Sequence, residues 1–333
     1  MKHFIKKSLS VLSLAFTMVA SPVSFAGERE PYPRWPGLQD ETYYVMGGDG
    51  RVFADHESEE NVVPASTVKL MTLYMLMEAL ENGDVRLDDE ITMSPKAANI
   101  SLAYSQAGIR AWHFFDVDFA LRSLFVYSAN DVASSVGAHL SKVINGEWSE
   151  RAFVKMMNEK AKELGMENTV FKDASGISRR NKTTAQDMML LANRFIADYP
   201  QLFDGDDSFL DYPSLTSAIR HGRAKAATNA LVLTDEYNGE VSGLSYSFHV
   251  DGLKTGFTAR AGFCLLASSV AVSPIDGSEY RVTVAYFGAS DKDERNERVI
   301  DLMETAYNQV FTVNDSETQV ASSLGKSPSP TVK

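Results

Sequence analysis

The chain has 333 residues, with 32 basic against 44 acidic side chains, a net charge of −12 and a single cysteine. This negative balance argues against nucleic acid as a partner, because phosphate binding requires a basic face, and it offers no attraction to anionic lipid headgroups. One cysteine cannot form an internal disulfide, and in the apolar run around Cys264 we expect a small buried side chain rather than a nucleophile.

The N-terminal segment has the three parts of a secretory signal peptide. Three lysines precede the apolar stretch 8–20, and small residues at Ser24 and Ala26 form a cleavage site. The apolar stretch is shorter than the ~20 residues of a membrane span, so an uncleaved anchor is the weaker interpretation. Cleavage after Ala26 removes three lysines and no acid, which leaves residues 27–333 with a net charge of −15 and no run apolar enough to cross a bilayer.

The elements expected first are two short strands and a buried helix. Residues 43–46 and 52–54 are rich in aromatic and β-branched side chains, and the glycines between them favour a hairpin turn. A helix is expected from Pro64 to about Asn82, and Gly83 lies where a left-handed residue would end it. Apolar residues on every side of this helix predict that it is buried all round.

The rest of the chain reads as helices followed by strands. The expected elements are helices near 115–127, 131–143, 149–164 and 184–198, strands at 244–250, 261–272 and 280–288, and an amphipathic helix at about 292–311. Strands at both ends predict an α/β (α+β) fold, in which an antiparallel sheet flanked by helices carries an inserted helical subdomain. The expected domains are a signal peptide at 1–26, a catalytic domain at 27–312 with its helical subdomain at about 90–220, and a disordered polar tail at 313–333.

The first candidate for catalysis is the pair Ser66 and Lys69. Their spacing of three places a hydroxyl and an amine on one helix face, at a helix N-terminus that favours developing negative charge. A buried lysine has a lowered pKa and could accept the Ser66 proton while the hydroxyl attacks a carbonyl. The motif alone is weak, because S-x-x-K occurs about once or twice by chance in such a chain and recurs at Ser323 to Lys326 in the polar tail.

Two further motifs strengthen the pair. Ser128-Ala129-Asn130 lies in a predicted turn between helices, and Lys254-Thr255-Gly256 lies on a predicted strand. Taken alone, the first reads as helix capping and the second as a lysine at a strand edge. S-x-x-K, then S-D-N, then K-T-G is the ordered set of class A β-lactamases and penicillin-binding proteins. All three motifs in this order make coincidence a poor explanation.

With these motifs the chain resembles the serine-type D-alanyl-D-alanine carboxypeptidases, which are low-molecular-mass penicillin-binding proteins. The resemblance covers about residues 40–312, and the stretches that carry it are 64–72, 128–131, 157–158, 164–171, 176–177, 183–187, 251–258, 261–262 and 264–265. It implies the β-lactamase/transpeptidase-like fold of those enzymes. It also implies an exported enzyme of cell-wall (peptidoglycan) biogenesis and cell shape, periplasmic or otherwise extracytoplasmic, that uses no cofactor or metal.

The resemblance also assigns roles to the motif residues. It implies that Ser66 is the nucleophile, that Lys69 is its general base, that Ser128 relays protons toward the leaving group, and that the Asn130 amide holds the substrate backbone. These four are the expected catalytic residues.

The expected substrate-binding residues belong to the third motif. The resemblance implies that Lys254 supplies positive charge, that Thr255 binds the substrate carboxylate, and that Gly256 and Phe257 lie beside the substrate. The backbone N–H groups of Ser66 and Phe257 would form the oxyanion hole. Some family members carry histidine after the K-T-G glycine, so Phe257 is a departure that affects substrate fit. A second departure is that only about 20 polar residues follow the last predicted helix, so no C-terminal membrane anchor is expected.

The function that the resemblance implies is hydrolysis of the terminal D-Ala–D-Ala bond of peptidoglycan stem peptides, with β-lactam antibiotics as covalent inhibitors. Cleavage of peptidoglycan cross-links by a D,D-endopeptidase would use the same acyl-enzyme and is an open alternative. A β-lactamase is disfavoured because no E-x-x-L-N segment occurs near Glu163 or Glu167, and an inactive binding protein is disfavoured by the intact motifs.

Overall fold

The computed structural model describes residues 34–203, 217–220, 223–234 and 236–324, all within the unit Pro33–Lys333. Their main sheet has six antiparallel strands. In sheet order the strands are β2 (Val52–His56), β1 (Thr42–Gly47), β10 (Glu279–Ala289), β9 (Gly262–Val272), β8 (Leu244–Thr258) and β7 (Tyr237–Val241). The sheet therefore joins N-terminal to C-terminal strands, as the sequence predicted.

The strand boundaries follow the expected turns. Gly50 and Gly277 both have positive φ, at +85° and +75°, and they lie in the β1–β2 and β9–β10 turns. β8 is longer than predicted, because it continues past Val250 to Thr258 and pairs with β9 as far as Gly262. This extension brings the Lys254-Thr255-Gly256 motif onto the strand, where it was expected.

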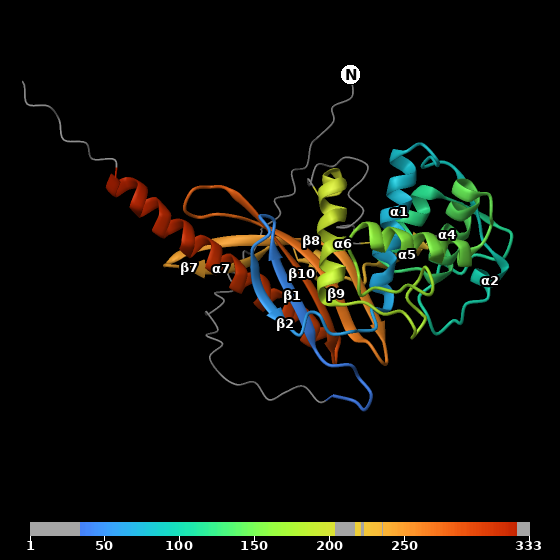
Figure 1. The fold of residues 1–333 in the computed structure, drawn as a ribbon, viewed down its shortest axis with the longest axis horizontal. Coiled ribbons are helices and arrows are strands. Elements are labelled where there is room, and N and C mark those ends of the chain that lie inside the picture. Colours follow the sequence, from blue (N-terminus) through green and yellow to red (C-terminus); the bar gives the residue numbers. More distant parts are fainter. Residues whose placement is uncertain (1–33, 204–216, 221–222, 235, 325–333) are drawn as a thin grey trace, which may run out of the picture. The chain divides into compact units, whose positions relative to one another are not determined.

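The region between β2 and β7 is mainly helical (Figure 1). Its helices are η1 (Ala65–Val68), α1 (Lys69–Glu81), α2 (Pro95–Ala98), α3 (Val117–Val126), α4 (Asn130–Asn145), α5 (Glu150–Glu163) and α6 (Ala185–Asp198). Short polar side chains cap four of them, since Ser94, Asp116, Ser149 and Thr184 each accept a hydrogen bond from the backbone N–H three residues further on. Gly83, with φ +75°, follows α1 as predicted.

Several short elements were not predicted. They are the hairpin of β3 (Glu90–Thr92) and β4 (Phe114–Asp116), the hairpin of β5 (Ser217–Arg220) and β6 (Arg223–Ala226), strand β7, helix α2, and the turns η2 (Pro200–Leu202) and η3 (Ala230–Leu233). Each spans five residues or fewer, which is too few to establish a hydrophobic period.

Apolar cores cover opposite faces of the sheet. Successive side chains on a strand point to opposite faces, and on β10 Val284 and Tyr286 join one core while Ala285 and Phe287 join the other. The first core also takes in Phe311 of α7 (Lys292–Leu324), the helix that lies along the strands in Figure 1. The second contains the buried faces of α1, α3, α4 and α6. The helical region therefore occupies one face of the sheet and α7 the other.

The C-terminal boundary differs from the expectation. A disordered tail was expected from residue 313, whereas α7 continues to Leu324. The physical reason is that residues 313–324 contain no proline or glycine to end the helix. The first such residue after α7 begins is Gly325. The segments 1–26 and 325–333 lie outside the described residues. Among those described, no helix has the length and apolar character needed to cross a membrane.

Candidate active site

Ser66 lies in the 3-10 turn η1, directly before α1. The preceding residue, Ala65, has φ +50°, a left-handed conformation that costs a non-glycine residue about 1–2 kcal/mol. The turn is held by the Thr67 hydroxyl, which donates to the carbonyl of Pro64 at 2.7 Å. The half-buried Ser66 side chain lines a cleft of about 440 Å³. The strained turn thus presents one hydroxyl at a helix N-terminus and at the surface of a cleft.

Lys69 is completely buried, and its amine lies beside the Ser66 hydroxyl. Nζ is 3.0 Å from Ser66 Oγ, 2.7 Å from Asn130 Oδ1 and 2.6 Å from the Ser175 carbonyl oxygen. The Asn130 amide is oriented by its other end, because Nδ2 donates to the Ser105 carbonyl at 2.7 Å. Oδ1 must therefore face Lys69.

These contacts suit a neutral amine. The Asn130 oxygen and the Ser175 carbonyl can only accept; when they take the two hydrogens of a neutral lysine, its lone pair faces the Ser66 hydroxyl, which can then donate to it. Burial lowers the pKa of Lys69 well below its ordinary value, and the positive charge of Lys254 lowers it further. The arrangement can therefore remove the proton of the Ser66 hydroxyl.

Ser128 lies in the short connection between α3 and α4. Its φ is +60°, again a left-handed conformation for a residue with a side chain. Ser128 lines the same cleft as Ser66, and within the described part of the chain its buried hydroxyl has no hydrogen-bond partner. An unpaired buried hydroxyl beside a cleft is available to a bound molecule.

The third motif forms one wall of the cleft. Thr255 Oγ1 is 2.8 Å from Thr228 Oγ1, and both threonines line the cleft together with Gly256 and Phe257. Among the described strands, β9 alone pairs with residues 254–258 of β8, because β7 pairs no further than Phe248. The other edge of this stretch is therefore without a strand partner in the described part of the chain, and a second extended chain can bind there.

Gly256 is required by close packing. A Cβ on Gly256 would lie 3.1 Å from the Ser66 nitrogen and 3.1 Å from the Pro64 carbonyl oxygen, which is tighter than most real contacts. The glycine thus lets β8 approach the turn that carries the nucleophile.

Lys254 lies behind this wall. It is 1% exposed, and its amine donates to the Thr255 carbonyl at 3.0 Å. Burial, together with the charge of Arg295, lowers the pKa of Lys254 to about 7. The structure therefore brings all eight predicted residues into one region, with Lys254 supporting the cleft wall from behind it.

The sequence from residue 36 to residue 274 matches the family profile described as D-alanyl-D-alanine carboxypeptidase. The chain belongs to this family. The match includes all three motifs described above.

Individual relatives of the carboxypeptidase family agree with this assignment. The chain is 32% identical over 266 residues to D-alanyl-D-alanine carboxypeptidase DacF of Bacillus subtilis, covering 79% of this chain and 60% of DacF. It is also 30% identical over 210 residues to the D-alanyl-D-alanine endopeptidase of Escherichia coli, covering 62% of this chain and 59% of that protein. It thus spans about 60% of each relative's length.

The fold of the family is shared by solved penicillin-binding proteins. Penicillin-binding protein D2 of Listeria monocytogenes, solved in its ampicillin-bound form, superposes with a TM-score of 0.62 at 24% identity, over 80% of this chain and 96% of that one. The expected transpeptidase-like fold is therefore confirmed.

Three basic residues of the cleft were missed by the sequence analysis. Arg179, Lys292 and Arg295 all line the cleft, and Arg295 is only 2% exposed. Burial lowers the pKa of Arg295 to about 10, so it is charged at neutral pH. None of these residues belongs to one of the three motifs, so the motif analysis did not point to them.

Two other features do not compete with this site. A second hollow of about 540 Å³ is lined by residues from 39–42 and 55–62, including several exposed acids, and neither Ser66 nor Lys69 is part of its lining. Cys264 is fully buried on β9, and burial raises the pKa of its thiol to about 12. The expected small buried side chain is confirmed.

Proposed function

We propose that this protein hydrolyses the terminal D-Ala–D-Ala bond of peptidoglycan stem peptides through an acyl-enzyme on Ser66. The observation that carries the proposal is the hydrogen-bonding of Lys69, whose lone pair faces Ser66 Oγ when Asn130 and Ser175 take its two hydrogens. Membership of the carboxypeptidase family supplies the class of substrate.

The first half of the reaction forms the acyl-enzyme. Lys69 takes the proton of Ser66 while Oγ attacks the carbonyl carbon of the penultimate D-alanine. The backbone N–H groups of Ser66 and Phe257 donate to the oxyanion of the tetrahedral intermediate. The proton then passes from Lys69, by way of the Ser128 hydroxyl, to the leaving amine, and free D-alanine departs.

The second half hydrolyses the acyl-enzyme. Water attacks the ester carbon, its proton passes to Lys69, and the Ser66 oxygen is released with that proton restored. The shortened stem peptide leaves with a new terminal carboxylate. Ser66 and Lys69 return to their starting protonation states.

Substrate recognition would use the free edge of β8. A stem peptide can add to residues 255–257 as an extended strand, so that its backbone groups pair with those of the protein. Its terminal carboxylate would bind the Thr255 hydroxyl within the positive field of Lys292 and Arg295, and Lys254 would add to this field at pH values below its pKa of about 7. This concentration of positive charge in an acidic protein suits an exopeptidase.

The same serine is proposed to react with β-lactams. The structural relative from Listeria was solved with ampicillin bound, and the two chains share one fold. We expect fluorescent penicillin to label the wild-type protein covalently. The Ser66→Ala variant, folded to the same extent as the wild type, should remain unlabelled. Absence of labelling in the wild type would disprove the acyl-enzyme mechanism.

Endopeptidase action on cross-links is the second candidate, and the similarity to the Escherichia coli endopeptidase favours it. The two activities differ only in the leaving amine. Incubation with a defined pentapeptide and with a purified cross-linked dimer separates them. Release of D-alanine from the pentapeptide with an intact dimer supports the carboxypeptidase, whereas conversion of the dimer to monomers supports the endopeptidase.

The site of action is proposed to be outside the cytoplasm, where peptidoglycan lies. Residues 1–26 carry the features of a signal peptide, so the exported protein should begin at Gly27. N-terminal sequencing of protein recovered from the periplasm or culture medium tests this boundary. A preserved Met1 would contradict it.

A further inference from the structure

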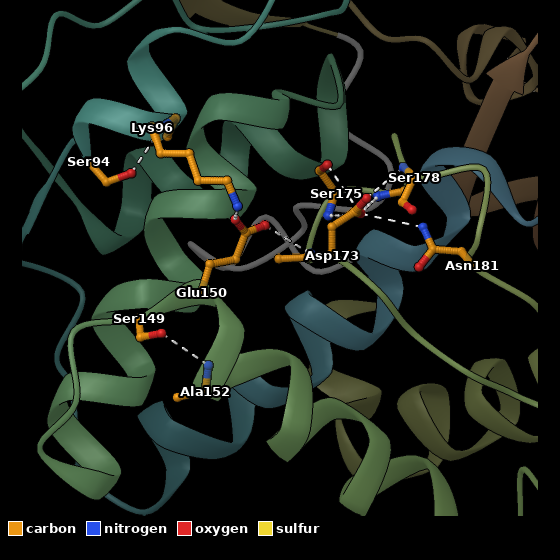
Figure 2. A network of polar contacts seen from close by, with 12 residues as sticks. Ser94, Lys96, Ser149, Glu150, Ala152, Asp173, Ser175, Ser178 and Asn181 are labelled. Atoms are coloured by element: carbon orange, nitrogen blue, oxygen red, sulfur yellow. Dashed lines mark hydrogen bonds and ion pairs between the residues drawn. The ribbon is translucent and has the colours of Figure 1, made fainter.

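A single carboxylate organises the turn that faces Lys69. Asp173 accepts hydrogen bonds from the backbone N–H groups of Ser175 at 3.0 Å, Gly176 at 2.5 Å and Ser178 at 2.6 Å (Figure 2). The first two reach Oδ1 and the third reaches Oδ2, so both oxygens of the carboxylate are used. We call residues 173–178 the Asp173 turn.

The Asp173 turn touches both members of the catalytic pair. The Ser175 carbonyl, whose own N–H is held by Asp173, accepts from Lys69 Nζ at 2.6 Å. The next residue, Gly176, has φ +87°, and a Cβ there would overlap the carbonyl oxygen of Ala65, the residue before the nucleophile. The turn therefore fixes the position of the base and packs against the backbone of Ser66.

The Asp173 turn is also fastened at Ala174. The Thr72 hydroxyl, one turn of α1 beyond Lys69, donates to the Ala174 carbonyl at 2.7 Å. Glu150 at the start of α5 accepts the Ala174 N–H at 3.3 Å and pairs with Lys96 at 2.7 Å (Figure 2). Ala174 is thus fixed relative to α1. The Asp173 carboxylate determines the path of the next two residues, Ser175 and Gly176.

We propose that Asp173 is a positioning residue for the Ser66–Lys69 pair, because it folds the turn that aims the Ser175 carbonyl at Lys69. With this carbonyl and Asn130 Oδ1 in place, the lone pair of the neutral amine has only Ser66 Oγ to face. The inference rests on the proposed function, since it assigns a role within the same acylation step.

The charge of Asp173 gives this role a measurable signature. The charged groups that face Lys69 are Lys254 on β8, which lowers its pKa, and Asp173 and Asp131, which raise it against the larger effect of burial. Asp131 lies at the start of α4, and its two oxygens accept the backbone N–H groups of Ala107 and Gly108. Removal of the Asp173 charge alone should lower the pKa of Lys69, so that the free amine persists to lower pH.

The test compares the rates of acylation by fluorescent penicillin across a pH series. Asp173→Asn keeps the size of the side chain but removes its charge and turns one acceptor into a donor. We expect its acylation rate on the high-pH plateau to fall below that of the wild type. We also expect its acid limb, the part of the profile where the rate rises as Lys69 loses its proton, to move to lower pH. Asp173→Ala loses the whole turn and should acylate about 10- to 100-fold more slowly, with the loss in the acylation rate constant rather than in penicillin binding.

The matched control is Asp187→Asn. The Asp187 carboxylate also holds a loop, accepting from the Asn168 N–H at 2.9 Å and from the Thr169 hydroxyl at 2.6 Å, and it is 4% exposed. Within the described part of the chain, its hydrogen-bond partners are Asn168, Thr169 and Thr184, and neither Lys69 nor Ser175 is among them. We expect this variant to lose thermal stability while it keeps the wild-type acid limb. A merely structural role for Asp173 predicts the same behaviour for both asparagine variants.

The outcomes separate this inference from the proposed function. Wild type that fails to label disproves the acyl-enzyme itself. Wild type that labels, beside an Asp173→Asn variant with an unchanged or upward-shifted acid limb or a wild-type plateau, overturns the role of Asp173 alone. If Asp173→Ala does not fold, the isosteric Asp173→Asn still decides the question.

Discussion

Lys69 shows how burial can make an ordinary side chain reactive. Its amine is removed from water, lies near the positive charge of Lys254, and contacts two oxygens that cannot donate. Each feature favours the neutral amine or directs its lone pair to Ser66. Burial destabilises the charged form of this amine, and the same cost favours the neutral form that can act as a base.

The pH dependence of acylation follows from this pKa. The reactive form is the neutral amine, so the rate rises with pH as Lys69 loses its proton and levels off once it is neutral. Because the pKa is lowered, we expect the plateau well below the ordinary lysine pKa of about 10.4. Stopped-flow labelling with fluorescent penicillin measures the profile.

Lys69→Arg is the matching variant, since its guanidinium stays protonated. We expect it to acylate about 10²- to 10⁴-fold more slowly at every pH. A wild-type rate that continues to rise through pH 10 would show that Lys69 keeps its ordinary pKa.

At the scale of elements, the site depends on where β8 and the Asp173 turn approach η1. Gly256 and Gly176 both lie within contact distance of residues 64–66; an added Cβ would overlap the Ala65 carbonyl at Gly176 and would crowd Pro64 and Ser66 at Gly256. The two glycines therefore permit separate segments to converge on the nucleophile from the sheet and from the helical region.

Gly176→Ala should abolish penicillin labelling, because its methyl group would overlap the Ala65 carbonyl and displace η1. Gly146→Ala is the matched control. Gly146 also has positive φ, at +80°, but nothing lies within 4 Å of its added Cβ. We expect this control to lose about 1 kcal/mol of stability and to label normally. Equal labelling by the two variants would contradict the close approach.

The long elements could be predicted because their sequences carry periods and caps. The helices α3 to α6 begin and end within two residues of their predicted bounds, and the paired strands β9 and β10 begin and end within one. The path of the Asp173 turn could not be predicted, because it depends on one carboxylate that accepts hydrogen bonds from three backbone N–H groups later in the chain. Arg295 was missed for a related reason, since only tertiary packing brings α7 to the cleft.

At the scale of the whole molecule, the two faces of the sheet are covered by different parts of the chain. The helical region covers one face and supplies Ser66, Lys69 and Asn130, whereas α7 covers the other with Tyr307 and Phe311. Phe311 is buried, and Thr312 is exposed. The stability of the fold therefore requires α7 at least as far as Phe311.

Truncation tests this boundary. We expect a chain of residues 27–312 to fold and to be labelled by penicillin at the rate of residues 27–333, with melting temperatures that differ by about 2 °C or less, a shift worth about 1 kcal/mol or less. A further cut before Val310 should unfold the protein, because it removes Phe311 from the core. Loss of labelling on removal of residues 313–333 alone would assign them a part in the fold. Thermal melts and gel fluorescence give both readouts.

The rate at which the Cys264 thiol is chemically modified can report how often the core around it opens. The thiol lies fully buried on β9, opposite Gly256, the motif glycine that packs against the nucleophile turn. A maleimide or disulfide reagent can reach it only in molecules in which the core around Cys264, between the sheet and the helical region, has opened, so the rate of modification measures those openings. Since the chain has no other cysteine, the measurement needs no engineered tag. Local opening of the core beside Gly256 can thus be timed in the unaltered protein.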